Sequence, residues 1–185
     1  FNLNVKAPYF LTQGLLPALT RSKGNVINIS SYFAHRMLPN RATTVYSATK
    51  GALNSFTKAL AFEVGHLGVR VNAIAPGSIS TPQFNRNLQA LTAEKQAAFQ
   101  TMVKEIYPLQ HIGTAKDIAQ AAVFLASENA SWITGTILAV DGGFFSNLTE
   151  KIINTDNVTH GVNVEVGKEQ VAVDLNIVVE YQKNV

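Results

Sequence analysis

The amino-acid sequence predicts an α/β fold, in which a parallel sheet carries helices on both faces and an antiparallel β-hairpin follows. Three short runs rich in Val, Ile and Ala have the length and composition of buried strands: residues 25–30, 69–75 and 136–140. Longer segments of helical periodicity lie between them, and strands that alternate with helices form parallel sheets. After residue 160, apolar residues recur at every second position, which is typical of a hairpin with one apolar face.

Four segments have the spacing of helices. Apolar side chains at Ala48, Ala52 and Phe56 recur every four residues and can share one face. Thr114 has the residue type of an N-cap ahead of the last helix, and Asp117 suits the first turn. We therefore expect helices over residues 3–19, 44–64, 83–107 and 115–127, with a loop over 32–43.

Small and polar residues follow each predicted strand. Ser30-Ser31 ends the first strand, Pro76-Gly77 ends the second and Asp141-Gly142-Gly143 ends the third. The carboxyl ends of parallel strands lie at one edge of a sheet, and α/β proteins bind ligands there. The sequence therefore predicts a single rim that is built from these three turns.

The C-terminal residues follow a different pattern. Two alternating stretches, Val162 to Val166 and Val171 to Tyr181, flank a turn at residues 167–170, which predicts an antiparallel hairpin. The segment before them is polar and resembles a linker. We therefore divide the chain into a first domain over residues 1–146, a linker over 147–160 and a hairpin fragment over 161–185.

The composition argues against several classes of protein. The 185 residues include no cysteine, which excludes disulfides and thiolate metal sites and fits a reducing, cytoplasmic location. No apolar run approaches the ~20 residues of a membrane span, and the four histidines are too dispersed for a metal site. The 15 Lys and Arg residues are scattered, which argues against a nucleic-acid surface. The sequence starts at Phe1, in the middle of the pattern of elements and without a Met, so we expect a chain that is cut at its N-terminus.

Tyr46 and Lys50 form the most informative pair in the sequence. They lie four residues apart, which places both side chains on one face of a helix, one turn apart. An ammonium group near a phenol stabilises the phenolate, which lets a tyrosine act as an acid or a base near neutral pH. Taken alone, the pair is better explained as a contact on a helix surface. Its neighbours along the chain make catalysis the stronger interpretation.

With these elements in order, residues 1–146 resemble the C-terminal part of the short-chain dehydrogenase/reductase family, and most of all its bacterial ketoacyl-carrier-protein reductases. Five segments in the family's order and spacing carry the resemblance: Asn4-Val5-Lys6, Asn28-Ile29-Ser30-Ser31, Tyr46-Ser47-Ala48-Thr49-Lys50, Val71 to Gly77, and Gly135 to Gly143. It implies the C-terminal portion of a doubly wound Rossmann-type sheet. It also implies an oxidoreductase that transfers a hydride between NAD or NADP and a small-molecule carbonyl or secondary alcohol.

The resemblance assigns catalytic roles to four residues. Tyr46 would protonate the carbonyl oxygen or deprotonate the alcohol, and Lys50 would favour deprotonation of Tyr46 and hold the nicotinamide ribose. Ser31 would stabilise the substrate oxygen, with Ser30 as a rival because the 15 positions from Ser31 to Tyr46 exceed the family's usual spacing. Asn4 would order a water in the proton relay, against the alternative that it is only an N-cap.

The same resemblance implies only part of a cofactor site. Four residues would hold the carboxamide end of the nicotinamide: Pro76, Gly77, Ile79 and Thr81. The family's N-terminal third is absent, with its Gly-rich turn and the residue that reads the adenine ribose, so NAD and NADP both remain open. Without those first strands, the strand over 25–30 has an unpaired edge. This favours an alternative function, in which the chain is a truncated, catalytically inactive piece with a structural or interaction role.

A second, shorter resemblance lies in the tail. Residues 161–181 are similar to a hairpin of the alkaline-shock, cell-envelope stress protein family, so the chain reads as a chimera of two fragments. A third hypothesis takes its function from that tail and makes it a stress or scaffold protein near a membrane. For the first domain, the family resemblance implies a homo-oligomer, a dimer or a tetramer, that associates through the helices over 3–19 and 44–64.

Overall fold

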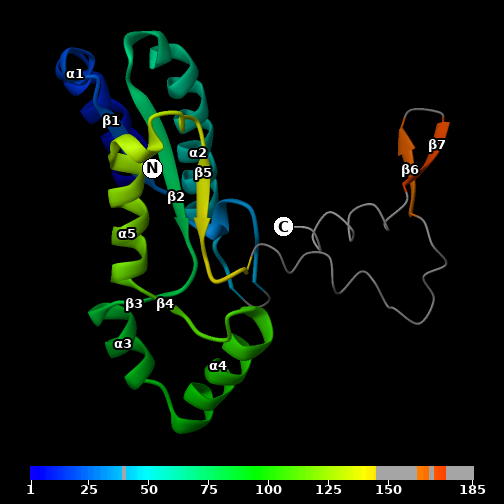
Figure 1. Cartoon of the computed structure of the whole chain (residues 1–185). Helices are drawn as coiled ribbons and strands as arrows, with labels where there is room; N and C mark the ends of the chain where they lie inside the picture. Colours follow the sequence, from blue (N-terminus) through cyan, green and yellow to red (C-terminus); the bar gives the residue numbers. More distant parts are fainter. Residues whose placement is uncertain (39–40, 145–161, 167–168, 174–185) are drawn as a thin grey trace. The chain divides into compact units, whose positions relative to one another are not determined.

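The structure is a computed structural model that describes residues 1–38, 41–144, 162–166 and 169–173. It divides into two units, Phe1–Asn147 and Leu148–Val185 (Figure 1). The first unit contains the sheet, its helices and all the predicted site residues. The second contains the hairpin.

The first unit is built on a parallel sheet of three strands: β1 (Asn25–Ile29), β2 (Arg70–Pro76) and β5 (Ile137–Val140). Their order is β1-β2-β5, so β2 is the central strand. The register pairs Asn25 with Arg70 and Ala73 with Ile137. The predicted α/β fold with a parallel sheet is thereby confirmed.

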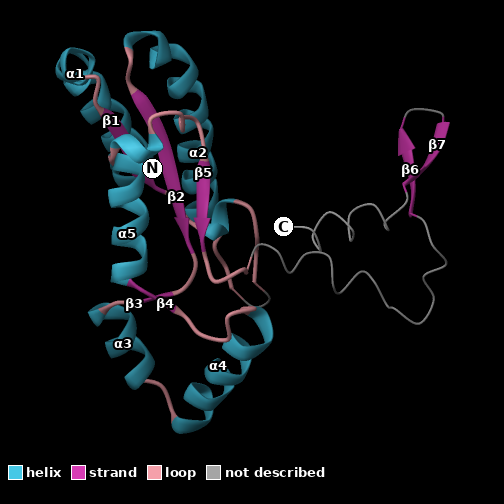
Figure 2. Ribbon diagram, in the orientation of Figure 1, coloured by secondary structure: helices cyan, strands magenta, loops and turns pink. Residues whose placement is uncertain are grey.

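Helices cover both faces of this sheet (Figure 2). α1 (Ala7–Ser22) and α2 (Thr44–Val64) lie on one face, and α5 (Ala115–Ala126) lies on the other. The side chains of the central strand alternate between the two faces of the sheet, so the helices on both faces bury them. Val71 packs in a cluster with Ala61 and Val64 of α2, whereas Ile74 packs with Leu125 of α5.

The region expected to be one irregular helix over 83–107 is two helices. α3 (Pro82–Gln89) and α4 (Ala93–Ile106) are separated by residues 90–92, where the Thr92 side chain accepts a hydrogen bond from the Lys95 N–H and caps α4. Both helices lie beyond the carboxyl ends of the strands, near the short pair β3 (Ile79–Ser80) and β4 (Gly113–Thr114) (Figure 1). Strands of two residues have no periodicity, so the sequence did not predict them.

Several element boundaries also differ from the expected ones. The first helix is preceded by a π-helical turn, η1 (Asn2–Lys6), and continues to Ser22. A 3-10 turn, η2 (Tyr32–Ala34), interrupts the expected loop. Two further 3-10 turns follow α2 and α5: η3 (Gly65–Leu67) and η4 (Glu128–Ala130). The bounds of α2 agree with the prediction.

The second unit contains β6 (Val162–Val166) and β7 (Glu169–Val173), which pair antiparallel and confirm the predicted hairpin. The expected turn at 167–170 is wrong in its second half, because Glu169 and Gln170 belong to β7. They pair with Val166 and Glu165, a register that also sets Val171 opposite Val164. The predicted linker and the strand residues after 173 lie outside the described part of the chain.

Candidate active site

The two serines at the carboxyl end of β1 have different partners. Ser30 extends the sheet, because its N–H donates to the Ile74 carbonyl at 2.7 Å, and its hydroxyl donates to Asn54 Oδ1 at 2.5 Å. The Ser31 hydroxyl instead accepts the Phe33 N–H at 3.2 Å and caps η2. Within the described residues Ser31 donates no side-chain hydrogen bond, so its proton is the one available to a ligand.

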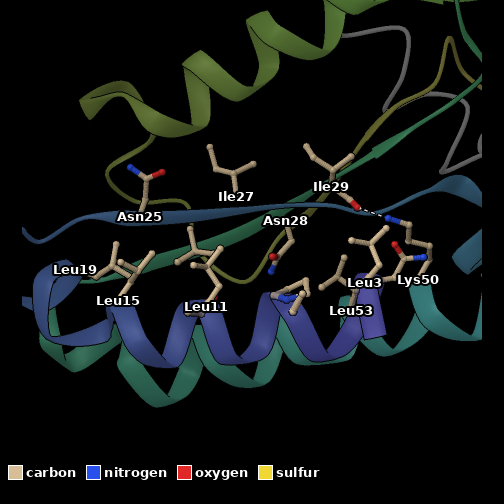
Figure 3. A pocket seen from close by; sticks show the side chains of 15 residues that line it. Leu3, Leu11, Leu15, Leu19, Asn25, Ile27, Asn28, Ile29, Lys50 and Leu53 are labelled. Carbon is tan, nitrogen blue, oxygen red and sulfur yellow. Dashed lines mark hydrogen bonds between the residues drawn. The ribbon is translucent and has the colours of Figure 1, made fainter. Parts of the chain in front are cut away.

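Tyr46 and Lys50 lie in the first two turns of α2, as their spacing predicts. The Lys50 Nζ is 5.6 Å from the centre of the Tyr46 ring. Tyr46 is 42% exposed, whereas Lys50 is only 9% exposed. Burial lowers the pKa of Lys50, and its Nζ donates to the Ile29 carbonyl at 2.6 Å (Figure 3). An exposed phenol therefore lies beside a buried ammonium group that is held against the end of β1.

Asn4 is tied to the same helix through one threonine. Its Nδ2 donates to Thr49 Oγ1 at 3.2 Å, and that hydroxyl donates to the Tyr46 carbonyl at 2.7 Å. Asn4 lies inside the π-helical turn, whose N-cap is Phe1. The alternative that Asn4 is an N-cap is therefore wrong. The structure brings Asn4, Ser31, Tyr46 and Lys50 to one end of β1.

The predicted nicotinamide-binding residues form one continuous segment along the rim after β2. Gly77 has a packing reason to be glycine, because a Cβ there would lie 2.9 Å from the Asp141 Cα on the loop after β5. Ile79 belongs to β3, and the Thr81 hydroxyl caps α3 by accepting the Phe84 N–H at 3.1 Å. The neighbouring turns after β2 and β5 are thus in close contact, as a shared rim requires.

One residue of the site, Asn54, was not singled out from the sequence. Asn54 joins Ser30 to His35, since its Nδ2 lies 2.7 Å from His35 Nε2. Asn54 follows Tyr46 and Lys50 at the i+8 and i+4 positions of the same helix face, a spacing that could have identified it. Near the rim, the Tyr107 hydroxyl donates to Ser78 Oγ at 2.8 Å and accepts the Ser78 N–H.

A second phenol near the rim differs sharply from Tyr46. Tyr32 directly follows Ser31 but is buried against Phe33, Tyr107 and Phe144. Burial, with a smaller contribution from Tyr107, raises its pKa to about 12. Tyr32 therefore remains protonated near neutral pH and packs as part of the core.

The family model adh_short_C2, described as enoyl-(acyl carrier protein) reductase, matches residues 1–145. The chain is 45% identical over 143 residues to an L-fucose dehydrogenase from Bos taurus, covering 76% of this chain and 50% of that protein. An oxidoreductase from Burkholderia thailandensis, of the short-chain dehydrogenase/reductase family, superposes with a TM-score of 0.71 at 31% identity, covering 84% of this chain and 58% of the other.

The chain therefore belongs to the short-chain dehydrogenase/reductase family. A solved 4-hydroxyisoleucine dehydrogenase complexed with NADH and succinate also superposes, with a TM-score of 0.65 and 31% identity over 78% of this chain and 57% of the other. The chain spans about half the length of the curated relatives it matches.

A second family model, for a family described as having a cell envelope-related function, matches residues 110–185, in agreement with the likeness seen in the tail. In the part of the chain that the structure describes, no helix is both long and apolar enough to cross a membrane.

Proposed function

We propose that this chain supplies the catalytic centre of an oxidoreductase that moves a hydride between NAD(P)H and a small carbonyl compound or secondary alcohol. Family membership supports the reaction class. The observation that carries the proposal is the convergence of Ser31, Tyr46 and Lys50 at the carboxyl end of β1, where α/β proteins bind ligands.

In the reduction direction, each residue's proposed role follows from whether its side chain has a proton to donate. NAD(P)H, when bound, supplies the hydride that reaches the carbonyl carbon. Tyr46 donates its phenolic proton to the carbonyl oxygen, and Ser31 donates a hydrogen bond to the same oxygen as negative charge develops on it. The Lys50 ammonium stabilises the phenolate that remains on Tyr46. In the oxidation direction, the same residues run the steps in reverse.

The donors at the rim fit the ribose of such a cofactor. The Lys50 ammonium and the Tyr46 hydroxyl project from successive turns of α2, and both can donate to vicinal hydroxyl groups. We propose that Pro76, Gly77, Ile79 and Thr81 hold the carboxamide end of the nicotinamide. Asn4 fixes the start of α2 through Thr49 and so positions Tyr46.

Cofactor binding by the chain itself tests this proposal. NADH and NADPH fluorescence are titrated against the wild-type protein, followed by turnover with a panel of small ketones. We expect saturable binding that weakens in Lys50→Met, because that variant loses the ammonium donor but keeps a side chain of similar length. Saturable binding with no difference between wild type and Lys50→Met would contradict the assigned role of Lys50.

A second candidate function has its own support. Because the chain spans about half the length of its curated relatives, we also consider that it acts as a structural or interaction piece that is inactive alone. The same titration separates the two candidates. Absence of binding for both nucleotides at millimolar concentration would favour the second.

A further inference from the structure

Tyr107 joins two parts of the rim that are distant in sequence. It follows the last residue of α4, and its hydroxyl contacts Ser78, which lies within the segment from Gly77 to Thr81. We propose that Tyr107 is a positioning residue, whose hydroxyl fixes the Ser78 peptide group and so sets the shape of this segment. The consequence for cofactor binding rests on the proposed function, which assigns the nicotinamide carboxamide to the same segment.

Tyr107 contacts both the backbone and the side chain of Ser78. The Ser78 N–H donates to the Tyr107 hydroxyl oxygen at 3.0 Å, and that hydroxyl donates its own proton to Ser78 Oγ at 2.8 Å. A phenol has one proton to donate and can still accept, so one hydroxyl serves both bonds. Two bonds to one residue fix the direction of its peptide N–H as well as the place of its side chain.

The Tyr107 bond completes a row of contacts along this segment. The Gly77 N–H donates to the Val140 carbonyl at 3.0 Å, and the Ser78 carbonyl accepts the Gly113 N–H at 3.0 Å. Between these two backbone bonds, the acceptor for the Ser78 N–H is a side chain. A substitution can therefore remove this one bond, while the backbone bonds on either side keep their partners.

The Tyr107 ring is itself held in place by packing. Tyr107 is 2% exposed, and its ring centre lies 5.3 Å from that of Phe144. The residues that follow it are tied to the loop after β5, since the Leu109 N–H donates to the Gly142 carbonyl at 3.2 Å. The hydroxyl is therefore a fixed point, and so deeply buried a ring acts on a ligand only through Ser78.

A second tyrosine of the same aromatic cluster also contacts Ser78. Tyr32 forms a side-chain hydrogen bond with Ser78. That bond involves the Ser78 hydroxyl, whereas Tyr107 also accepts the backbone N–H. Tyr32→Phe and Ser78→Ala both remove bonds of the Ser78 hydroxyl and keep the backbone bond. They are the matched controls for Tyr107→Phe, which keeps the ring and removes the acceptor.

Amide hydrogen exchange of the full chain tests whether the hydroxyl fixes the segment. In Tyr107→Phe, we expect the Ser78 amide to exchange at least about tenfold faster, because its N–H loses its acceptor. Gly77 and Gly113 keep their own partners, so faster exchange at both would show that the segment as a whole has loosened. Ala73, in the middle of β2, should be unchanged in every variant.

Two results would overturn the proposal. One is faster exchange at Ser78 alone in Tyr107→Phe, which would mean that the other bonds hold the segment. The other is faster exchange at Gly77 and Gly113 in Ser78→Ala or Tyr32→Phe, which would assign the effect to the Ser78 hydroxyl. The second result needs only the two controls, so it can overturn the proposal even if Tyr107→Phe does not fold.

Cofactor selectivity supplies a readout that overall stability does not move. Calorimetry measures the dissociation constants of NADH and of its reduced 3-acetylpyridine analogue, which lacks the amide N–H groups of the carboxamide. We expect the wild type to prefer NADH, and Tyr107→Phe to reduce that preference by about tenfold, while both controls keep it. An equal preference in Tyr107→Phe and the wild type would overturn the proposal. Absence of binding by the wild type would instead contradict the proposed function, and the exchange measurement would then decide for Tyr107 alone.

Discussion

The two ends of the parallel sheet are built in different ways. At the amino end, Val71 packs against Val64 and Leu19, and the Arg70 guanidinium donates to the Leu125 carbonyl at 2.7 Å at the end of α5. At the carboxyl end, an aromatic cluster that includes Tyr32 and Phe144 lies beside buried polar groups that bond to one another, as in the contact from Ser30 to Asn54. The carboxyl end therefore combines packing with hydrogen bonds between buried side chains.

The largest effect is expected where the packing is most complete. Leu125 is buried beside Ile74 and Ala130. Leu125→Ala should lower the free energy of unfolding by about 2–5 kcal/mol, because it removes transfer energy and leaves a cavity. Urea denaturation measures this change. Val123→Ala, on the exposed side of the same helix, should change it by less than about 0.5 kcal/mol. Equal losses in the two variants would contradict the account of this end.

Substitutions at the carboxyl end of the sheet should lower the free energy of unfolding by leaving buried polar groups without hydrogen-bond partners, and not by creating cavities. Asn54→Leu leaves the buried Ser30 hydroxyl without its acceptor and should cost about 1–3 kcal/mol. Ser30→Ala in the same protein removes that hydroxyl and should restore part of the loss. Urea denaturation of the two single variants and the double variant measures the coupling energy. Strictly additive losses would show that the 2.5 Å contact carries no energy.

A smaller effect is expected from the arginine at the amino end. The two Arg70 bonds, to the Leu125 and Ser127 carbonyls, join β2 to the end of α5. Because Arg70 is half-buried, Arg70→Met should cost about 1.5 kcal/mol, near the lower limit for hydrogen bonds to a charged group. Arg70→Lys keeps the charge but not the two-donor geometry, so thermal denaturation should place it between the wild type and Arg70→Met. A melting temperature equal to that of the wild type in Arg70→Met would contradict this role.

The smallest effect is a pH dependence at the carboxyl end. Burial lowers the pKa of Lys50 below the ordinary 10.5, so in the window just below 10.5 the unfolded chain binds more protons at this group than the folded chain does. The contribution of Lys50 to the free energy of unfolding therefore rises with pH through that window. Urea denaturation at a series of alkaline pH values should show a steeper rise in the wild type than in Lys50→Met. Parallel curves would contradict the lowered pKa.

The sequence predicted the regular elements better than the short ones. The repeated apolar spacing of residues 44–64 set both ends of α2, since a long amphipathic pattern persists over many turns. β3 and β4 have two residues each and could not be found in that way. The break between α3 and α4 depends on the Thr92 cap, which is a weaker local signal than periodicity.

In the candidate site, too, the sequence predicted what depends on spacing within one helix, but not what depends on contacts between elements. The spacing of Tyr46 and Lys50 placed both on one helix face, and the structure brings Lys50 Nζ to 5.6 Å from the Tyr46 ring. The contact of Asn4 with Thr49 depends on a π-helical turn, which no periodic pattern specifies. The different partners of Ser30 and Ser31 depend on Asn54, which approaches from another element. Contacts between elements are what the sequence alone could not supply.

Variants of Tyr46 and Tyr32 test the proposal that Tyr46 is the general acid. Turnover of a ketone with NADPH is measured for the wild type, Tyr46→Phe and Tyr32→Phe. We predict that Tyr46→Phe lowers turnover by at least about 100-fold, because it removes the general acid, while its melting temperature is unchanged. Tyr32→Phe should keep most of the turnover, since the pKa of Tyr32 is raised to about 12. Wild-type turnover in Tyr46→Phe would contradict the account.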